Sequence, residues 1–449
     1  MDNKRASSRR FNNPVQWQNK KEFFKIFGIL SILLWLLFLS TMCYLYGSTW
    51  KFPSRVQAFH ILYVDYDQGV IGKSVDQAYE RLRGPSFLTL DKADTARFPS
   101  IEDVVDEVKK NKYWGAFLVH PDSSDRLSEA IQGGEAASKY GSSPALTYVW
   151  NEVRYPPITD EAIEGSFTGL VEATRQSYNA LYASQAMQNL NSSSPQALQA
   201  FLDPVPFSSI NLMPTLQGTK LFYNTVGMVM PILQQFFFLL ILNGLSYELK
   251  IYKELSFQAT LLLRTIASVA FTFGASLCTA GYIWAFREAW QVNGNQFVLS
   301  WMVYWLLMYV HLLILDCCTA FLPPPALPFV VLPYIIINIT GTISPFEINP
   351  GFYRWAYALP AKEAYDVLTD IWSGGYVPSL YRALPVVFSW LVAASVVAVF
   401  GHRFRYRALL RKLREADETA EKRVSTSVSP TFTDVNINRH IEEDMDSEV

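Results

Sequence analysis

The stretch Ile26-Phe-Gly-Ile-Leu-Ser-Ile-Leu-Leu-Trp-Leu-Leu-Phe-Leu-Ser-Thr-Met-Cys-Tyr-Leu-Tyr46 decides the fold class of this chain of 449 residues. It contains no charged side chain. A helix rises about 1.5 Å per residue and the hydrocarbon core of a bilayer is about 30 Å thick, so roughly 20 apolar residues cross it. The stretch therefore predicts a spanning helix over residues 26–46. It is too long for a typical cleaved signal peptide.

The residues before this helix set its orientation. Segment 1–25 is rich in lysine and arginine, and its acidic residues are Asp2 and Glu22. Lysine and arginine accumulate on the cytoplasmic side of spanning helices. This basic N-terminus is therefore predicted to lie in the cytoplasm.

The segment 221–402 holds five more apolar runs, which predict spans two to six at 226–245, 259–286, 297–315, 328–343 and 384–400. With six spans both termini lie on one side, and the basic residues between 403 and 414 agree with a cytoplasmic C-terminus. The polar tail 403–449 is predicted to be disordered. Arg264 lies close enough to the cytoplasmic end of the third span for its side chain to reach the interface.

Between the first two spans, segment 47–220 has the mixed composition of a water-soluble domain. Short apolar runs predict strands at 58–64, 113–119 and 145–153. The stretches between them predict helices at 73–83, 101–112, 122–131 and 159–190. Alternating strands and helices indicate an α/β domain. The sequence thus predicts a polytopic α-helical membrane protein with six transmembrane helices and an α/β extracytoplasmic domain inserted between helices 1 and 2.

Composition and motifs exclude several functions. A net charge of −2 gives no basic surface for nucleic acid. The histidines lack metal-ligand spacing, and no paired acid and base suggests catalysis, so we expect no catalytic, cofactor-binding or metal-binding residues and no enzymatic activity. Asp67-Gln-Gly-Val-Ile-Gly-Lys-Ser74 resembles a phosphate-binding loop but has Asp67 where that loop requires glycine. We expect no ATPase domain in this chain.

Polar side chains inside the predicted spans are candidates for a solute pathway. Such residues are costly at membrane depth unless they face protein or water. Hydrogen bonding between helices is the alternative explanation. The candidates are Gln234, Gln235, Asn243, His311, Asp316 and Asn338.

Two further features lie outside the predicted spans. The segment 350–376 is rich in aromatic rings, with charged residues between them, and predicts an amphipathic segment in the outer headgroup region. Alternatively, its rings form a belt that anchors the sixth helix. Asn191-Ser-Ser is a glycosylation sequon in the predicted external domain. The aromatic residues that begin the segment are Phe352, Tyr353, Trp355 and Tyr357.

Four stretches carry a resemblance to a known family. They are Val64-Asp-Tyr-Asp-Gln-Gly69, Tyr113-Trp-Gly-Ala116, Val149-Trp-Asn-Glu-Val-Arg154, and the block that begins at Ser344-Pro-Phe-Glu347 and continues through Pro350-Gly-Phe-Tyr-Arg-Trp-Ala-Tyr-Ala-Leu-Pro360. Between Gly28 and His402 the chain resembles the fungal nitrosoguanidine-resistance proteins, which are related to the membrane domain of type-2 ABC exporters.

The resemblance implies one span, a large external domain, five further spans and a place in the plasma membrane. The family pattern often has an amide before the pair Ala364-Tyr365, where this chain has Glu363. That departure leaves the role of the aromatic segment open.

Topology and resemblance together suggest an exporter-like plasma-membrane protein involved in drug or mutagen resistance. It would act by transporting lipids or amphipathic solutes, or by maintaining membrane lipid asymmetry. The alternative is a non-transporting scaffold or sensor whose external domain binds a partner. Membrane lipids are the expected partners, and a homodimer is expected because related half-transporters usually need a second copy.

Overall fold

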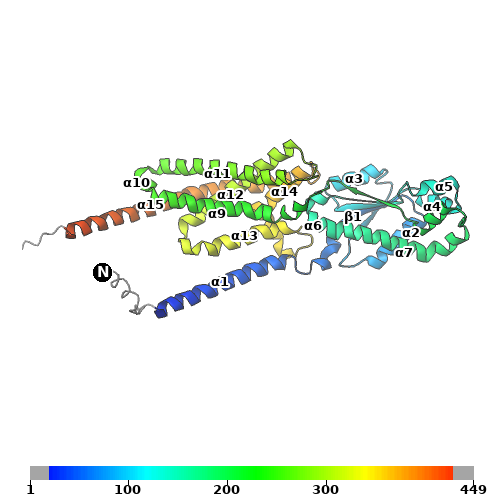
Figure 1. Ribbon diagram of the computed structural model, residues 1–449, viewed down its shortest axis with the longest axis horizontal. Coiled ribbons are helices and arrows are strands. Elements are labelled where there is room, and N and C mark those ends of the chain that lie inside the picture. The colour runs from blue at the N-terminus through cyan, green and yellow to red at the C-terminus, as the bar shows by residue number, and fades with distance from the viewer. Residues whose placement is uncertain (1–19, 428–449) are drawn as a thin grey trace, which may run out of the picture.

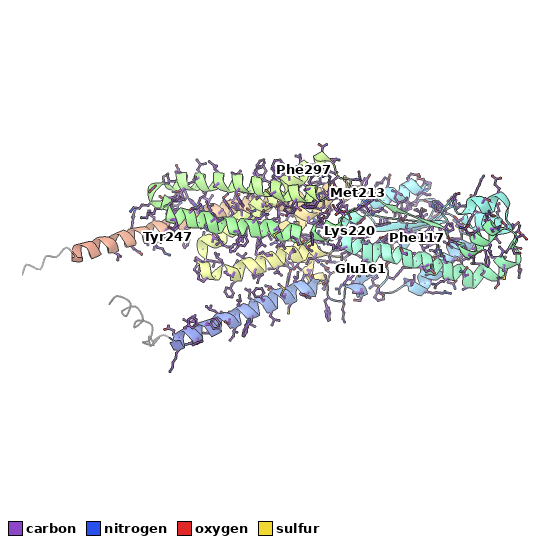
Figure 2. All side chains as sticks on the ribbon, in the orientation of Figure 1. Phe117, Glu161, Met213, Lys220, Tyr247 and Phe297 are labelled. Atoms are coloured by element: carbon purple, nitrogen blue, oxygen red, sulfur yellow. The ribbon has the colours of Figure 1, made fainter. Side chains whose placement is uncertain are left out.

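The computed structural model describes residues 20–427 and has two parts joined end to end, a helical bundle and a lobe built around a sheet (Figure 1). The lobe is formed between helices α1 and α9 and lies beyond one end of the bundle. We call this the lobe end of the bundle and the opposite end the distal end. In Figure 2, Phe117 lies inside the lobe, Lys220 at the junction and Tyr247 toward the distal end.

Within residues 20–427, six helices are long and apolar enough to cross a membrane, in agreement with the six spans that the sequence predicts. The protein is a multi-pass membrane protein. Helix α12 is central and packs against α9, α11 and α15, whereas α1 packs mainly against α13 and exposes most of its apolar side chains. Exposed apolar faces of this kind suit a lipid environment. The six are α1 Lys20–Ser48, α9 Val226–Glu248, α11 Phe257–Ala285, α12 Gly294–Phe321, α13 Pro328–Ile343 and α15 Leu380–Ser427.

Local sequence signals begin these helices. The Ser256 side chain accepts a hydrogen bond from the backbone N–H of Ala259 and caps α11. Asn293 and Gln296 form a reciprocal capping box at the start of α12. Pro360 occupies the first turn of α14 (Pro360–Trp372), where its missing N–H costs no hydrogen bond.

The lobe contains a five-stranded sheet in the order β2-β1-β3-β4-β5. Strands β3 and β4 are antiparallel and the other neighbours are parallel. Strands β2 and β5 were missed by the sequence analysis because they are short, partly exposed and lack a continuous apolar run. The strands are β1 His60–Asp65, β2 Thr89–Ala93, β3 Gly115–Val119, β4 Leu146–Trp150 and β5 Phe207–Asn211.

Side chains alternate between the two faces of the sheet, as the pleat requires. On one face of the sheet, Leu62 and Leu118 belong to a core that the sheet forms with helix α3. On the opposite face, Tyr63 and Phe117 belong to a larger core. The larger core continues through α14 into α9 and α12, so apolar packing connects the lobe to the bundle. The longer lobe helices are α2 Val70–Leu82, α3 Ile101–Lys109, α4 Ser123–Gln132 and α7 Gly165–Gln188.

Short elements complete the described chain. Four are short α-helices: α5 Gly134–Tyr140, α6 Pro156–Ile158, α8 Pro195–Leu202 and α10 Ile251–Glu254. The others are the π-helical stretch η3 Thr159–Glu164 and the 3-10 stretches η1 Phe52–Ala58, η2 Glu152–Arg154, η4 Gly218–Phe222, η5 Pro324–Ala326 and η6 Gly351–Ala358.

The sixth spanning helix is longer than the sequence analysis predicted. Residues 403–427, predicted to be disordered, continue α15 as helix. Two contacts hold its continuation: Arg405 donates to the Asp316 carboxylate at 2.8 Å, and the Tyr406 hydroxyl donates to the Leu255 carbonyl at 3.1 Å. The rest of that predicted tail, 428–449, and most of the predicted basic N-terminus, 1–19, lie outside the described residues.

Candidate functional site

Helix α14 is buried along almost its whole length, although it carries four acidic or basic side chains among its thirteen residues. It packs against α12, α13, α15 and the η2 stretch of the lobe. This differs from the predicted amphipathic segment in the headgroup region, because the charged side of α14 faces other protein groups instead of water. Its charged residues are Lys362, Glu363, Asp366 and Asp370.

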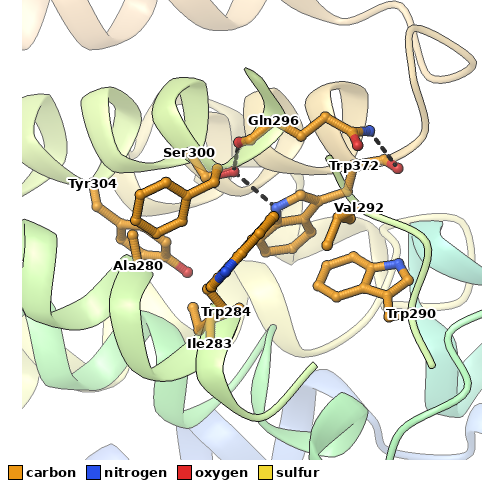
Figure 3. Close-up of a pocket in the computed structure, with 10 residues that line it drawn as sticks. Ala280, Ile283, Trp284, Trp290, Val292, Gln296, Ser300, Tyr304 and Trp372 are labelled. Carbon is orange, nitrogen blue, oxygen red and sulfur yellow. Dashed lines mark hydrogen bonds between the residues drawn. The ribbon is translucent and has the colours of Figure 1, made fainter. Parts of the chain in front are cut away.

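The C-terminal end of α14 is fixed by aromatic packing and hydrogen bonds (Figure 3). The Trp372 indole N–H donates to the Ser300 hydroxyl at 2.9 Å, and the Gln296 amide donates to the Ile371 carbonyl at 2.8 Å. Trp284 and Trp290 help to line a cavity of about 20 Å³ beside them. That volume holds about one water molecule, so this cavity positions α14 and is too small for an organic ligand.

A glycine lets α13 approach α14 closely. A Cβ atom at Gly341 would lie 3.1 Å from the Cβ of Ala356 and 3.5 Å from the Cβ of Lys362. The first distance is shorter than ordinary van der Waals contact. The absence of a side chain at Gly341 therefore brings η6 and α14 against the spanning bundle.

Ion pairs satisfy the buried charges of α14. The Arg382 guanidinium, from α15, donates to Glu363 at 3.0 Å and to Asp366 at 2.5 Å. Lys362 donates to the same Asp366 carboxylate. Glu363 is fully buried, and this burial raises the pKa of its carboxyl group although Arg382 opposes the rise. The charge at position 363, where the resembled family often has an amide, is thus matched by an arginine on the next helix.

The lobe contributes an arginine to the same region. The Arg154 guanidinium lies 3.3 Å from the centre of the Trp114 ring, which is a cation–π contact. The Arg154 carbonyl accepts a hydrogen bond from the Tyr365 hydroxyl of α14 at 3.2 Å. Burial lowers the pKa of Arg154 to about 10, so its side chain remains a cation at neutral pH. Within residues 20–427 that side chain forms no ion pair within 4.0 Å, although the nearby carboxylates of Glu347 and Asp366 act to raise its pKa.

These groups surround a cavity of about 170 Å³ between the lobe and the bundle, which we call the junction cavity. Aromatic rings of Trp114, Tyr155, Phe346 and Tyr357 form part of its wall. Its charged lining residues are Arg154, Glu347, Lys362, Asp366 and Arg382.

Three of the stretches that carry the family resemblance converge on the junction cavity. Trp114 comes from the stretch 113–116 and Arg154 from 149–154. Phe346, Glu347 and Tyr357 come from the long block. The sequence analysis did not identify this site, because its parts are far apart in the chain and meet only in the folded structure. The sequence signal that could have indicated the junction cavity is that these residues all belong to stretches that resemble the family.

A second ionic cluster supports the connection from the lobe to α9. Lys220 donates to Glu152 at 2.8 Å and to Asp160 at 2.6 Å. Although burial acts to raise it, the pKa of Glu152 is lowered by hydrogen bonds from Lys220, Thr215 and Asn211. The cluster ties the end of β4 to the segment that leads into the second span.

The predicted polar residues of the spans lie in two separate groups. In the first, His311 Nδ1 is 2.6 Å from the Tyr334 hydroxyl, and the Asn338 amide donates to the Tyr334 carbonyl at 3.0 Å. Gln235 is fully buried on the neighbouring helix α9, and its amide forms no hydrogen bond with the described part of the chain. Gln234 is half-buried beside it.

Helix geometry places the first group at one depth. A Cβ atom at Gly227 would lie 3.6 Å from the Tyr304 hydroxyl, so these two residues of α9 and α12 are level. Both helices run from there toward the distal end. Gln234 and His311, each seven residues farther along, therefore lie about 10 Å nearer the distal end than Gly227 and Tyr304.

The second group lies nearer the distal end. Arg264 donates to Asn243 at 2.9 Å and to Asp316 at 2.8 Å. Arg264 is only 4% exposed, so it does not reach toward the interface as the sequence analysis expected, because Asp316 pairs with it inside the bundle. Asn243 and Asp316 are thus separate from the first group.

The predicted aromatic residues lie on η6, a 3-10 stretch beside the lobe end of α1. Phe352 and Trp355 are exposed, while the Tyr353 hydroxyl donates to the Tyr44 carbonyl of α1 at 2.7 Å. Tyr357 turns to the junction cavity and lies 4.4 Å from the Arg382 guanidinium. Tyr353 therefore contacts α1, whereas Tyr357 lines the junction cavity.

Asn191 is exposed on the loop between α7 and α8 of the lobe. Its side-chain amide donates to the Gln132 carbonyl at 3.3 Å. Glycosylation of Asn191 stays a prediction.

Comparison with known proteins identifies the family. A family described as protein of unknown function, DUF3533, matches residues 30–396. The chain belongs to the DUF3533 family. The matched region covers the junction cavity and all six spanning helices at least in part.

One curated relative is described as a membrane protein, in agreement with the spanning helices of this chain. The chain is 22% identical over 342 residues to a protein of Saccharomyces cerevisiae described as an uncharacterized endoplasmic reticulum membrane protein. The match covers 69% of this chain and 62% of that relative. No solved structure matches the chain.

Proposed function

We propose that this DUF3533 protein binds lipids or amphipathic drugs at the junction cavity and moves them within or across the membrane, in the manner of an exporter. This activity would contribute to drug or mutagen resistance or to membrane lipid asymmetry. The observation that supports the proposal is the charged and aromatic cavity at the lobe ends of the spanning helices. The polar heads of membrane lipids lie at that level of a bilayer.

The lining of the cavity suits a molecule with a charged head. Arg154, Lys362 and Arg382 supply cations, and Glu347 and Asp366 supply carboxylates. Arg154 has capacity for a ligand, because its guanidinium contacts the Trp114 ring and forms no ion pair within 4.0 Å in residues 20–427, although Glu347 and Asp366 lie near enough to act on its pKa. A phosphate or carboxylate oxygen would complete its hydrogen bonds, and guanidinium groups bind such oxygens well.

We further propose that the lobe faces away from the cytoplasm and that both termini face it. The basic residues favour this orientation, because Lys250 and Arg403 lie at the distal end of the bundle. The plasma membrane is the location that the sequence resemblance suggests, while the yeast relative is described as an endoplasmic reticulum protein. In either membrane the lobe would lie outside the cytosol. Membrane fractionation of cells that express a tagged full-length chain shows whether the protein is in the plasma membrane or in the endoplasmic reticulum.

The remaining parts of the proposal concern energy and assembly. The protein acts without enzymatic chemistry of its own, so directional transport would depend on a gradient or on an ATPase from another chain. It works as a homodimer in contact with membrane lipids. Mass measurement of the purified protein in a mild detergent tests the dimer, because a strictly monomeric mass contradicts it.

A reconstitution assay tests the transport proposal. Purified protein in liposomes should move a fluorescent lipid between leaflets, and Arg154→Met should slow this movement about tenfold or more. That factor corresponds to the roughly 1.4 kcal/mol lost with a charged hydrogen bond. Arg83→Met is the matched control, because Arg83 is an exposed lobe arginine that pairs only weakly with Glu80 at 3.5 Å.

Two results would contradict the proposal. If wild-type liposomes move lipid and drug no faster than empty ones, the protein is not a transporter of these molecules. If Arg154→Met and Arg83→Met have equal rates, the junction cavity is not the binding site. Melting temperatures of both variants show whether a slow rate merely reflects unfolding.

One observation favours the alternative of a scaffold or sensor. The lobe has a second cavity of about 280 Å³, lined by residues such as Ser124, Asp125, Tyr178 and Gln185 of helices α4 and α7. This part of the lobe lies away from the bundle, and Asp125 and Gln185 are exposed, so a soluble partner could reach them. Loss of drug resistance on Gln185→Ala, which changes an exposed residue of the cavity wall, with lipid movement unchanged, would support this alternative.

A further inference from the structure

A groove of about 230 Å³ lies within the distal half of the bundle, separate from the junction cavity. Helix α12 forms its floor and packs against both α11 and α15, which form its sides. Thr265 and Val399 on the two sides are exposed, so the groove is open toward surrounding lipid. We call it the distal groove.

The two ends of the distal groove differ in polarity. On α12 the lining runs from Tyr309 through Leu312 and Leu313 to Asp316, and on α15 it runs from Ser395 to His402. In both helices the ionisable group lies at the distal end, about 10 Å along the axis from the first lining residue. The charged groups therefore lie at one end of the groove, while leucine, alanine and valine side chains, with the hydroxyls of Ser268, Tyr309 and Ser395, line the rest. A charged end and a mostly apolar length match the layout of a lipid molecule.

The polar end carries an excess of positive charge. Asp316 is the one carboxylate there, and it accepts hydrogen bonds from Arg264 at 2.8 Å and from Arg405 at 2.8 Å. Both arginine side chains are at most 7% exposed. Arg405 also donates to the Asp316 carbonyl at 2.8 Å and to the Thr319 hydroxyl at 2.9 Å, but two buried guanidinium groups still share one carboxylate, so an anion would balance the second charge.

Unused hydrogen-bonding groups lie at the same end. His402 lines the groove, is 2% exposed, and forms no hydrogen bond through either ring nitrogen within the described chain. Around it lie the rings of Tyr252, Phe257 and Tyr406. Nη1 of the neighbouring Arg405 is also buried without a partner among residues 20–427. Buried polar groups of this kind normally have partners.

We propose that the distal groove binds one anionic phospholipid from the leaflet at the distal end. Its phosphate accepts hydrogen bonds from His402 and Arg405 and supplies the missing negative charge. One acyl chain covers Leu312, Leu313 and Val399. A soluble anion matches the charge but leaves these apolar walls uncovered, so the lateral opening favours a lipid.

The test uses full-length protein in phosphatidylcholine nanodiscs that contain a minor fraction of phosphatidylserine. Native mass spectrometry counts the lipids of each kind that stay bound. The wild type should retain phosphatidylserine with at least about fivefold preference, the effect of roughly 1 kcal/mol per basic residue beside an anionic lipid surface. This binding readout is independent of the transport assay, so either proposal can fail alone.

Three variants locate the site. Ala398→Phe fills the groove and should abolish the preference, while Val397→Phe, on an adjacent residue that is 46% exposed and does not line the groove, should keep it. His402→Leu breaks no hydrogen bond within the protein and should lower the preference without lowering the melting temperature. This last variant keeps the test valid if Ala398→Phe fails to fold.

Three outcomes would overturn the proposal. The first is equal retention of phosphatidylserine and phosphatidylcholine by the wild type. The second is an equal preference for phosphatidylserine in His402→Leu and Val397→Phe. The third is loss of bound phosphatidylserine on addition of inorganic phosphate, which would assign the polar end to a soluble anion.

Discussion

Replacement of Arg382 by methionine tests whether ion pairing allows α14 to lie inside the protein. Methionine keeps most of the length of the side chain and removes its charge. Glu363, which is fully buried, loses its cation, while Asp366 keeps Lys362. We expect a clear loss of stability, because the Glu363 carboxylate stays in an apolar environment without compensation.

The size of the effect follows from burial. Removing one partner of a buried ion pair costs about 3–5 kcal/mol. The side chain of Arg382 is 37% exposed, so water screens part of this interaction and we expect about 2–3 kcal/mol. The entropy of unfolding for a chain of 449 residues is roughly 0.9 kcal/mol per kelvin. The melting temperature should therefore fall by about 2–3 °C if the chain unfolds in one step.

A double-mutant cycle isolates the pair. Glu363→Gln removes the charge that Arg382 compensates, so the double variant should melt higher than Arg382→Met alone. Arg403→Met, an exposed arginine on the same helix, should change the melting temperature by less than about 1 °C. Thermal unfolding in detergent, followed by intrinsic fluorescence, measures the wild type and the four variants. The reasoning is refuted if Arg382→Met melts at the same temperature as the wild type. It is also refuted if the change in melting temperature of the double variant equals the sum of the changes of the two single variants.

Three further predictions concern other parts of the protein. Deglycosylation should increase the gel mobility of the wild type but not of Asn191→Gln, because the proposed orientation places the lobe in the lumen or the exterior; unchanged wild-type mobility argues against glycosylation there. Gly341→Val should cost about 1–3 kcal/mol through its clash with Ala356, whereas Gly274→Val, whose Cβ meets open space, should cost little on the same melting assay. Burial raises the pKa of Glu363 above its usual 4.5, so the stability this group contributes is present below about pH 4.5 and is lost as the pH rises through the raised value. As the pH rises from about 4 to 7, the melting temperature of Glu363→Gln should therefore increase relative to that of the wild type. A difference between the two melting temperatures that stays constant over this range would contradict this reasoning.

The predicted site residues show where sequence reasoning fails. His311 and Asn338 are indeed buried near Tyr334, as polar residues in spanning helices must be when they avoid lipid. Their sequence spacing gave no indication that Asn243 and Asp316 belong to a different group around Arg264. That grouping depends on how α9, α11 and α12 pack, and helix packing is not local information.

The lobe gave a mixed result for a related reason. Strands β1, β3 and β4 are continuous apolar runs and were predicted, since a strand buried on both faces needs apolar residues throughout. Strands β2 and β5 pair at the edges of the sheet, where partial exposure permits polar side chains. Periodicity alone could not separate them from loops.

The sequence by itself determined the six spanning helices, because about 20 consecutive apolar residues have no stable alternative to a membrane. Only the tertiary structure decided that α14 is buried. In sequence α14 is amphipathic, and its charges could equally have faced water. Arg382 on the next helix and Arg154 on the lobe lie beside it, and long-range ion pairs and packing of this kind replace hydration.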